Sequence, residues 1–402
     1  MTSEWHEVPL RELVGYISKG IAPSYAEEAS ETTIRVLNQK CNRNFRISYG
    51  DSRLHDTLKK KVPPERYVKP DDILINSTGA GTAGRIAQIE DVPSATTIDG
   101  HMILIRSNGK VTQKFLGYAL KAHQWEVLQL DEGSTGQTEL NRDRLLDEIM
   151  INYPVSFDEQ NAIVGTLESI DRKLIVNEQL NDNLEQQAQA IYHERFETIS
   201  PNDLPSEWRI VTLGEVATIS SKSFNPLKEP EILLEHYSIP AFDEARFPVF
   251  ELSTSIKSNK FIIDASCFMI SKLNPTTKRV WKPYCLTGNA VCSTEFIVYK
   301  AKDKTITDFL YSVIDSNSFS DFMCSHVTGS TGSRQRTTPS DTLSYELTLP
   351  SEDELAEFQS LVSPMYAQIR INAIENDRLK RLRDSLLPKL MSGEIDVSTI
   401  QL

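Results

Sequence analysis

Two stretches of the chain combine small, hydroxyl-bearing and basic side chains in a way that suits contact with nucleic acid. They are STGAGTAGR at 77–85 and KLNPTTKRVW at 272–281. Backbone N–H groups and Ser or Thr hydroxyls bind phosphate oxygens, while Arg and Lys also bind base edges. An ordinary polar loop is the alternative for either stretch. The candidate contacts are Ser77, Thr78, Thr82, Arg85, Lys272, Asn274, Thr276, Lys278 and Arg279.

A third basic cluster, GSTGSRQR at 329–336, carries guanidinium and amide groups that match guanine and adenine edges as well as phosphates. Its candidate contacts are Arg334, Gln335 and Arg336. Isolated basic residues complete the set, namely Lys19, Lys40, Arg43, Lys222 and Lys260. The run 59–61 of three lysines is more typical of a solvated face. We expect Arg85, Arg279, Arg334 and Arg336 to lead in reading bases.

The sequence lacks the motifs of common catalytic centres. GAGTAG at 79–84 matches the dinucleotide-binding pattern, but Pro93 interrupts the helix that such a motif must open. The chain has no P-loop, no GxSxG string, no HExxH string and no Asn-Pro-Pro-aromatic string typical of adenine methylases. We therefore expect no catalytic residue, no metal site and no cofactor bound by this chain.

Charge and composition set the class of protein. The net charge is −13, which argues against a nucleic-acid binder, but residues 157–206 alone hold 3 basic and 10 acidic side chains. Residues 1–156 are close to neutral, with 19 basic and 21 acidic side chains. No apolar run is long enough for a membrane span, and the first residues do not resemble a signal peptide. These features, with five dispersed cysteines read as reduced thiols, predict a cytoplasmic protein without membrane contact.

The chain contains an internal repeat. EWHEVPLRELVGYISK at 4–19 recurs as EWRIVTLGEVATISSK at 207–222, and GSTG at 133–136 recurs at 329–332. Two copies predict an internal pseudo-two-fold arrangement, which suits a target with two halves, although a duplication kept for stability is the alternative. We expect an α+β fold with two mixed α/β domains, 1–156 and 201–350, and two helical segments, 157–200 and 351–402. Strands are predicted at 72–77, 101–107, 267–272 and 295–300.

Both helical segments show a heptad seam. Apolar or amide residues recur at alternating spacings of four and three from Ile163 to Ile191 and, with Arg383 as an exception, from Phe358 to Leu390. Paired asparagines occupy matching seam positions, Asn177 with Asn181 and Asn372 with Asn376. We expect two long antiparallel, coiled-coil-like helices that separate the mixed domains and in which these asparagines meet; a solvated flank is the alternative. Pro364 predicts that the second helix restarts there, with Ser363 as N-cap.

These strings and their order resemble the specificity subunit of a type I restriction-modification enzyme over nearly the whole chain. The marks are the openings at Trp5 and Trp208, GAGTAGR at 79–85, HYSIPAFDE at 236–244, SKLNPTTKRVW at 271–281 and the closing LRDSLLPKLMSGEI at 382–395. One departure is QTELNR at 137–142, which follows the first GSTG where the second copy has SRQR.

The resemblance implies two target recognition domains that each read one half of a bipartite, asymmetric site in double-stranded DNA. It also implies that the helices dock two methyltransferase subunits, which bind S-adenosylmethionine, and that restriction motor-nuclease subunits use ATP and Mg²⁺. The chain itself would supply specificity without chemistry. The remaining alternatives are an enzyme without a familiar motif and a helical scaffold that never touches DNA.

Overall fold

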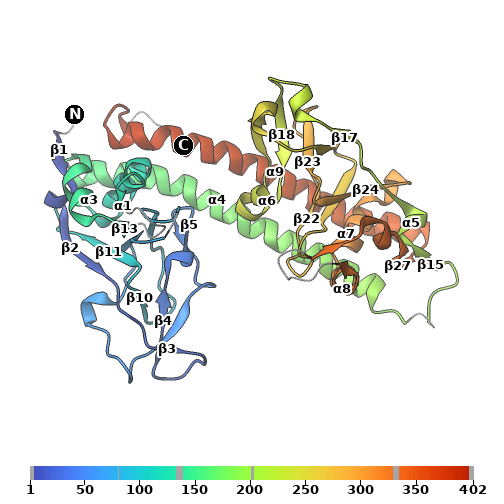
Figure 1. Cartoon of the computed structure of the whole chain (residues 1–402), viewed down its shortest axis with the longest axis horizontal. Coiled ribbons are helices and arrows are strands. Elements are labelled where there is room, and N and C mark those ends of the chain that lie inside the picture. Colours follow the sequence, from blue (N-terminus) through green and yellow to red (C-terminus); the bar gives the residue numbers. More distant parts are fainter. Residues whose placement is uncertain (1–3, 80, 133–138, 201–202, 329–334, 398–402) are drawn as a thin grey trace. The chain divides into compact units, whose positions relative to one another are not determined.

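The computed structural model of the chain describes residues 4–79, 81–132, 139–200, 203–328 and 335–397. Its contacts define two compact units: unit 1 is Met1–Lys173 with Leu379–Leu402, and unit 2 is Leu174–Arg378. Each unit contains one mixed α/β segment and parts of two long helices, α4 (Phe157–Tyr192) and α9 (Glu352–Met391) (Figure 1). The two long helices are therefore shared between the units.

Unit 1 consists of short strands and three short helices packed on parts of α4 and α9. The strands are β1 (Trp5–Pro9), β2 (Val14–Lys19), β3 (Tyr25–Ala26), β4 (Thr33–Leu37), β5 (Asn42–Arg43), β6 (Arg46–Ile47), β7 (Arg53–Asp56), β8 (Ile73–Asn76), β9 (Ile86–Gln88), β10 (Thr96–Ile98), β11 (Met102–Ser107), β12 (Asp131–Glu132), β13 (Glu139–Leu140) and β14 (Met150–Pro154). The helices are α1 (Gln113–Ala122), α2 (Gln124–Val127) and α3 (Arg142–Glu148). Its two larger sheets have the strand orders β2-β11-β8-β9 and β10-β4-β7-β3.

The antiparallel pair β8 and β11 is buried on both faces. Because successive side chains of a strand point to opposite faces, each strand serves two cores. Ile73 and Ile75 pack with α1, α4 and α9, whereas Leu74 packs with β4 and β10 of the second sheet. On β11, Ile103 packs into the core with α1, α4 and α9, and Leu104 packs into the core with β4 and β10. The predicted strands at 72–77 and 101–107 are confirmed, and this pair joins the two sheets of unit 1.

Unit 2 repeats the plan of unit 1. Its strands are β15 (Arg209–Thr212), β16 (Ala217–Ile219), β17 (Ser223–Phe224), β18 (Leu233–Tyr237), β19 (Val249–Leu252), β20 (Lys260–Ile262), β21 (Cys267–Ser271), β22 (Val280–Trp281), β23 (Ala290–Ser293), β24 (Phe296–Ala301), β25 (Val327–Thr328), β26 (Arg336–Thr337) and β27 (Glu346–Leu349). Its short helices are α5 (Leu213–Val216), α6 (Ile239–Ala245), α7 (Thr307–Asp315) and α8 (Asn317–Ser325). The larger sheets have the orders β16-β24-β21-β22 and β17-β20-β23-β18-β19.

The pair β21 and β24 corresponds to β8 and β11. Phe268 and Ile270 face the core built on α4, α7 and α9, while Cys267 and Met269 face the core of the five-stranded sheet. The predicted strands at 267–272 and 295–300 are confirmed. The internal repeat of the sequence is thus a repeat of architecture.

The prediction that α9 restarts at Pro364 is wrong. The helix is continuous over forty residues, and the Ser363 hydroxyl donates to Asp308 Oδ2 at 2.5 Å instead of capping a new helix. A proline in a helix interior costs about 3 kcal/mol. Phe358 and Val362 before it and Tyr366 after it are buried in one core, so their packing outweighs that cost.

The C-terminal end of α9 lies at Met391, with Pro388 inside the last turn. Gly393 follows with φ of 74°, and a Cβ there would lie 2.9 Å from the Trp5 ring. Only glycine combines that backbone conformation with so close an approach.

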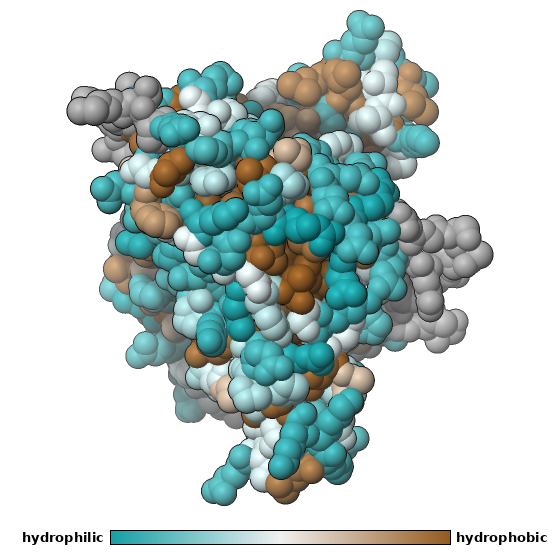
Figure 2. Space-filling view, turned by 90° about the vertical axis from the view of Figure 1, so that its left-hand side faces the viewer, coloured by the Kyte–Doolittle hydropathy of each residue, from teal (hydrophilic) through white to brown (hydrophobic). Residues whose placement is uncertain are grey.

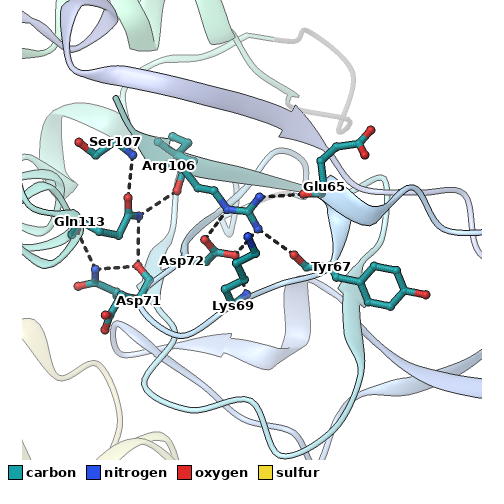
Figure 3. Close-up of polar contacts among 10 residues, drawn as sticks. Glu65, Tyr67, Lys69, Asp71, Asp72, Arg106, Ser107 and Gln113 are labelled. Atoms are coloured by element: carbon teal, nitrogen blue, oxygen red, sulfur yellow. Dashed lines mark hydrogen bonds and ion pairs between the residues drawn. The ribbon is translucent and has the colours of Figure 1, made fainter. Parts of the chain in front are cut away.

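A buried ion pair connects the residue before β8, Asp72, to Arg106 near the end of β11 (Figure 3). The Arg106 guanidinium binds both carboxylate oxygens of Asp72 at 2.7 Å and donates to the backbone carbonyls of Glu65 and Tyr67. The Asp72 side chain is 3% exposed. The hydrogen bond to this carboxylate raises the pKa of Arg106. The pair connects the central strands to the segment that leads into them.

The surface of the chain is mixed in character. Among the described residues no helix is long and apolar enough to cross a membrane. The face drawn in Figure 2 is mostly hydrophilic, with apolar side chains gathered near its centre. Large apolar residues exposed on unit 1 include Met150, Val155 and Phe157.

We predict that Arg106→Met lowers the free energy of unfolding by about 3–5 kcal/mol, because it leaves the Asp72 carboxylate buried without its partner. The double variant Arg106→Met with Asp72→Asn should lose less than the sum of the two single changes, since no unpaired charge remains. Urea denaturation of the three variants measures this. Lys110→Ala, which removes an exposed cation of the same unit, is the control. Additive losses in the double variant would contradict the coupling.

Candidate nucleic-acid interface

The first candidate loop, 77–85, connects β8 to β9 and is a tight backbone turn. Gly79 has φ of 110° and a Cβ there would meet the side chains of Thr82 and Gln39; Gly84 has φ of 84° and lies against the Val127 carbonyl. The backbone N–H groups of Thr82 and Ala83 both donate to the Gly79 carbonyl at 2.9 Å. The glycines therefore serve a turn between two strands, and the loop does not open a helix as a dinucleotide motif would.

The predicted contacts of the first loop have different environments. Thr78 is half-buried, and its hydroxyl lies 2.8 Å from His101 Nδ1. Thr82 is half-buried and makes long hydrogen bonds of 3.3 and 3.4 Å to backbone carbonyls. Arg85 donates to the Gly81 carbonyl at 3.1 Å and forms no ion pair with a described residue. Its guanidinium is the loop's available cation.

Other candidate cations of unit 1 lie on segments that are connected to this loop through their neighbours. Lys19, at the end of β2, pairs with Glu139. Lys40 and Arg43 are both exposed. Asn42, beside Arg43, is buried and its amide donates to the Arg85 carbonyl at 2.8 Å. The structure therefore connects the segment around Lys40 and Arg43 to the first loop.

The second candidate loop, 272–281, connects β21 to β22. Asn274 has φ of 49°, and its backbone N–H donates to the Gln335 carbonyl at 3.0 Å. Its side-chain Oδ1 is buried without a hydrogen bond to a described residue. Lys272 is half-buried and Thr276 is exposed; the Lys272 ammonium forms no ion pair within the described ranges. The loop thus lies next to Gln335, the described end of the third basic cluster.

Three predicted cations of unit 2 are held by carboxylates. Arg279 binds Asp243 through two hydrogen bonds of 2.6 and 2.9 Å. Lys278 pairs with Asp315 at 3.0 Å. Arg336 pairs with Glu295 at 3.0 Å, and this hydrogen bond raises the pKa of Arg336. A base or phosphate must displace these carboxylates before it can bind the same groups.

Two predicted contacts are buried in the chain. Ser77, the first residue of the first loop, is 0% exposed, and its hydroxyl makes no hydrogen bond to a described residue. Lys260 is 5% exposed, its ammonium donates to Ser258 and Asn259, and burial lowers its pKa. Their local sequences resemble exposed polar segments, and only the surrounding sheets bury them.

The remaining candidate cations are Lys222 and Arg334. Lys222 is exposed before β17, and Arg334 lies outside the described residues. Trp281, at the end of the second loop, is 3% exposed in the core with Tyr237 and Phe242 and is not available as a surface contact. The carboxylates that form ion pairs with four of the candidate cations were not identified from the sequence, because no local pattern marks them. They are Glu139, Asp243, Asp315 and Glu295.

The four seam asparagines meet within unit 2. Asn177 Nδ2 donates to Asn376 Oδ1 at 2.8 Å, and Asn372 Nδ2 donates to Asn181 Oδ1 at 2.8 Å. Asn177 is 1% exposed, Asn372 3% and Asn376 6%. The crossed pairing requires that α4 and α9 run antiparallel in this unit. A polar pair in an apolar seam sets the register, because a shift would bury the amides unpaired.

The described residues contain no group of three or more His, Cys, Asp or Glu side chains that could hold a metal ion. All five cysteines are free, and burial raises the pKa of the Cys267 thiol to about 11. What the two loops display is binding chemistry: cations, hydroxyls and backbone N–H groups.

Comparisons with known proteins agree with this picture. Residues 2–186 match the family described as type I restriction modification DNA specificity domain. The type I restriction enzyme MjaIX specificity subunit of Methanocaldococcus jannaschii is 25% identical over 384 residues, or 88% of this chain and 84% of that protein. The HindI specificity subunit of Haemophilus influenzae is 32% identical over 93 residues, 23% of this chain and 20% of that protein.

A solved structure supports the fold. The crystal structure of a type I restriction-modification S subunit from M. genitalium aligns with a TM-score of 0.57 at 16% identity, covering 97% of this chain and 99% of that one. The predicted α+β class is confirmed by this likeness and by the element order of the chain.

We predict that Asn177→Leu lowers the free energy of unfolding by about 1–3 kcal/mol, because Asn376 Oδ1 and Glu375 Oε2 both lose this donor. Replacing both members of the pair, Asn177→Leu with Asn376→Leu, should recover part of that loss, since the buried Asn376 amide is then removed. Thermal denaturation compares the variants, with the exposed Asn183→Ala as control. A double variant less stable than Asn177→Leu would contradict the role of the pair.

Proposed function

We propose, from the premise that this chain belongs to the family of type I restriction-modification specificity subunits, that it reads a bipartite, asymmetric DNA site. In this proposal it directs two methyltransferase subunits and the restriction motor-nuclease subunits to that site. The chain contributes sequence recognition, and its partners contribute the chemistry with S-adenosylmethionine, ATP and Mg²⁺.

The repeat of architecture is the observation that carries the proposal. Units 1 and 2 share a central antiparallel strand pair buried on both faces, and in each unit a loop with hydroxyl and basic side chains follows the first strand of that pair. The loops differ in sequence, so the two half-sites they read should differ. A scaffold that only assembles proteins has no need for two such loops.

Arg85 and Lys272 are the proposed reading cations. Each is half-exposed in its loop and has no carboxylate partner among the described residues. A bidentate Arg contact or a Lys contact to guanine contributes about 1–3 kcal/mol of discrimination. Lys278, Arg279 and Arg336 could join after exchanging their carboxylates for DNA, and Arg334, Thr276 and Gln335 stay proposed contacts of the same surface.

The acidic balance of the chain supports the need for partners. With a net charge of −13 the chain has little electrostatic attraction for a polyanion. We propose that it binds DNA weakly alone and firmly when methyltransferase subunits enclose the duplex.

The test is to co-express the chain with a partner methyltransferase subunit in a methylation-free host and to sequence modified adenines. We expect a two-part motif with a fixed spacer. Arg85→Ala should relax a base in one half of the motif, and Lys272→Ala should relax a base in the other half.

Lys257→Ala, which removes an exposed cation of unit 2, should leave the motif unchanged. A soluble complex that modifies no adenine would refute the proposed function. A change in both halves from one substitution would refute the division of the site between the units.

A further inference from the structure

The hairpin formed by β5 and β6 in unit 1 has an aromatic residue with positive φ in its turn. It is a two-residue turn with Arg43 paired to Arg46, and the turn residues Asn44 and Phe45 have φ of 52° and 62°. Asn tolerates this left-handed region, but an aromatic residue there is strained. Such strain persists only where the surrounding structure holds the residue in place.

Phe45 is held by what lies beneath it. Its ring packs against the core of unit 1, its backbone bridges Ala87 of β9, and the Lys121 ammonium lies 4.9 Å from the ring centre. Because the ring is anchored, the side chains on either side are held at the turn: Asn44 and Arg43 are exposed, and Arg46 is partly exposed. The strained backbone of Phe45 thus accompanies a turn on which Asn44 and Arg43 are exposed.

The segment that contains the hairpin is basic. Residues 38–50 hold three cations, Lys40, Arg43 and Arg46, and no carboxylate. Arg43 is exposed and makes no ion pair with any residue that the structure describes. Its guanidinium is therefore available to a ligand.

The hairpin is joined to the first candidate loop. Asn42, on β5, donates to Asn76 Oδ1 at 3.2 Å and to the Arg85 carbonyl at 2.8 Å. Asn76 in turn donates to the Gln39 carbonyl at 3.1 Å. The hairpin and the loop are therefore connected by hydrogen bonds through Asn42 and Asn76.

The corresponding position in unit 2 lacks the hairpin. In unit 1, β4 runs parallel to β10 and is followed by a short 3-10 helix, Gln39–Cys41, which Asn38 caps, and then by the hairpin. In unit 2, β18 runs parallel to β23 and is followed by α6, which Ser238 caps, and then by β19, which pairs with β18. The hairpin is therefore an addition that distinguishes unit 1 after equivalent strands.

We propose that the hairpin tip Arg43–Arg46 is a second element of unit 1 that, beside Arg85 of the first loop, reads bases in the DNA major groove. A two-stranded ribbon fits that groove, Arg binds guanine through two hydrogen bonds, and Asn binds adenine in the same way. Arg43 and Arg46 are the specificity-determining side chains, Asn44 reads beside them, and Phe45 is a positioning residue. This inference rests on the proposed function and names the reading element within it.

The experiment uses the complex with the partner methyltransferase subunit in a methylation-free host, with modified adenines sequenced genome-wide. Arg43→Ala and Arg46→Ala should each lower discrimination about 5- to 150-fold at one base, which corresponds to about 1–3 kcal/mol, and all changes should fall in one half of the motif. Phe45→Ala keeps both cations and should relax the same positions. Lys61→Ala, an exposed cation of the same unit outside the hairpin, should change nothing.

Several outcomes would overturn the inference. An unchanged motif in both arginine variants would do so, as would a uniform loss of methylation at all sites, which indicates phosphate contact only. Arg43→Lys, together with the yield and melting temperature of each complex, separates these outcomes from misfolding. If the wild-type complex modifies no two-part motif, the proposed function fails and this inference fails with it; a wild-type motif that the variants leave intact refutes the hairpin alone.

Discussion

Each candidate loop begins at a strand with both faces buried, and this double burial supports the rest of each unit. Ile73 and Ile75 of β8 contribute to one core while Leu74 contributes to another, and Phe268 and Met269 of β21 divide in the same way. A strand so enclosed cannot slip by one residue without exchanging its two cores. The loop that leaves its end therefore starts from a fixed point, which is what reading a sequence of bases requires.

Electrostatics set the second constraint. Four of the candidate cations lie against carboxylates, namely Lys19, Lys278, Arg279 and Arg336. Arg43, Arg85 and Lys272 are among the candidate cations for which the described residues provide no carboxylate partner. In the proposed function, these few groups carry the discrimination, and the bulk of the affinity comes from the assembled complex.

The repeat and its local variation serve different purposes. Equivalent strand pairs, equivalent parallel pairs and equivalent caps at Asn38 and Ser238 give the two units one scaffold. The elements attached to that scaffold differ, with a short 3-10 helix and the hairpin after β4 and α6 after β18. A duplicated scaffold with divergent attachments can present two unlike surfaces while the cores beneath stay the same, so that recognition can change without loss of folding.

The sequence by itself determined the elements with strong periodic or repeated signals: the central strands, the two seams, the asparagine positions and the doubling of the fold. Those features follow from side-chain alternation and heptad spacing, which are local properties of the chain. Tertiary structure decided which side chains are available. Ser77 and Lys260 look exposed in sequence but are buried by neighbouring sheets, Arg279 is occupied by a carboxylate 36 residues away, and Pro364 stays helical because a core formed by distant residues holds it. Burial and ion pairing depend on residues far apart in the chain, so no local pattern can reveal them.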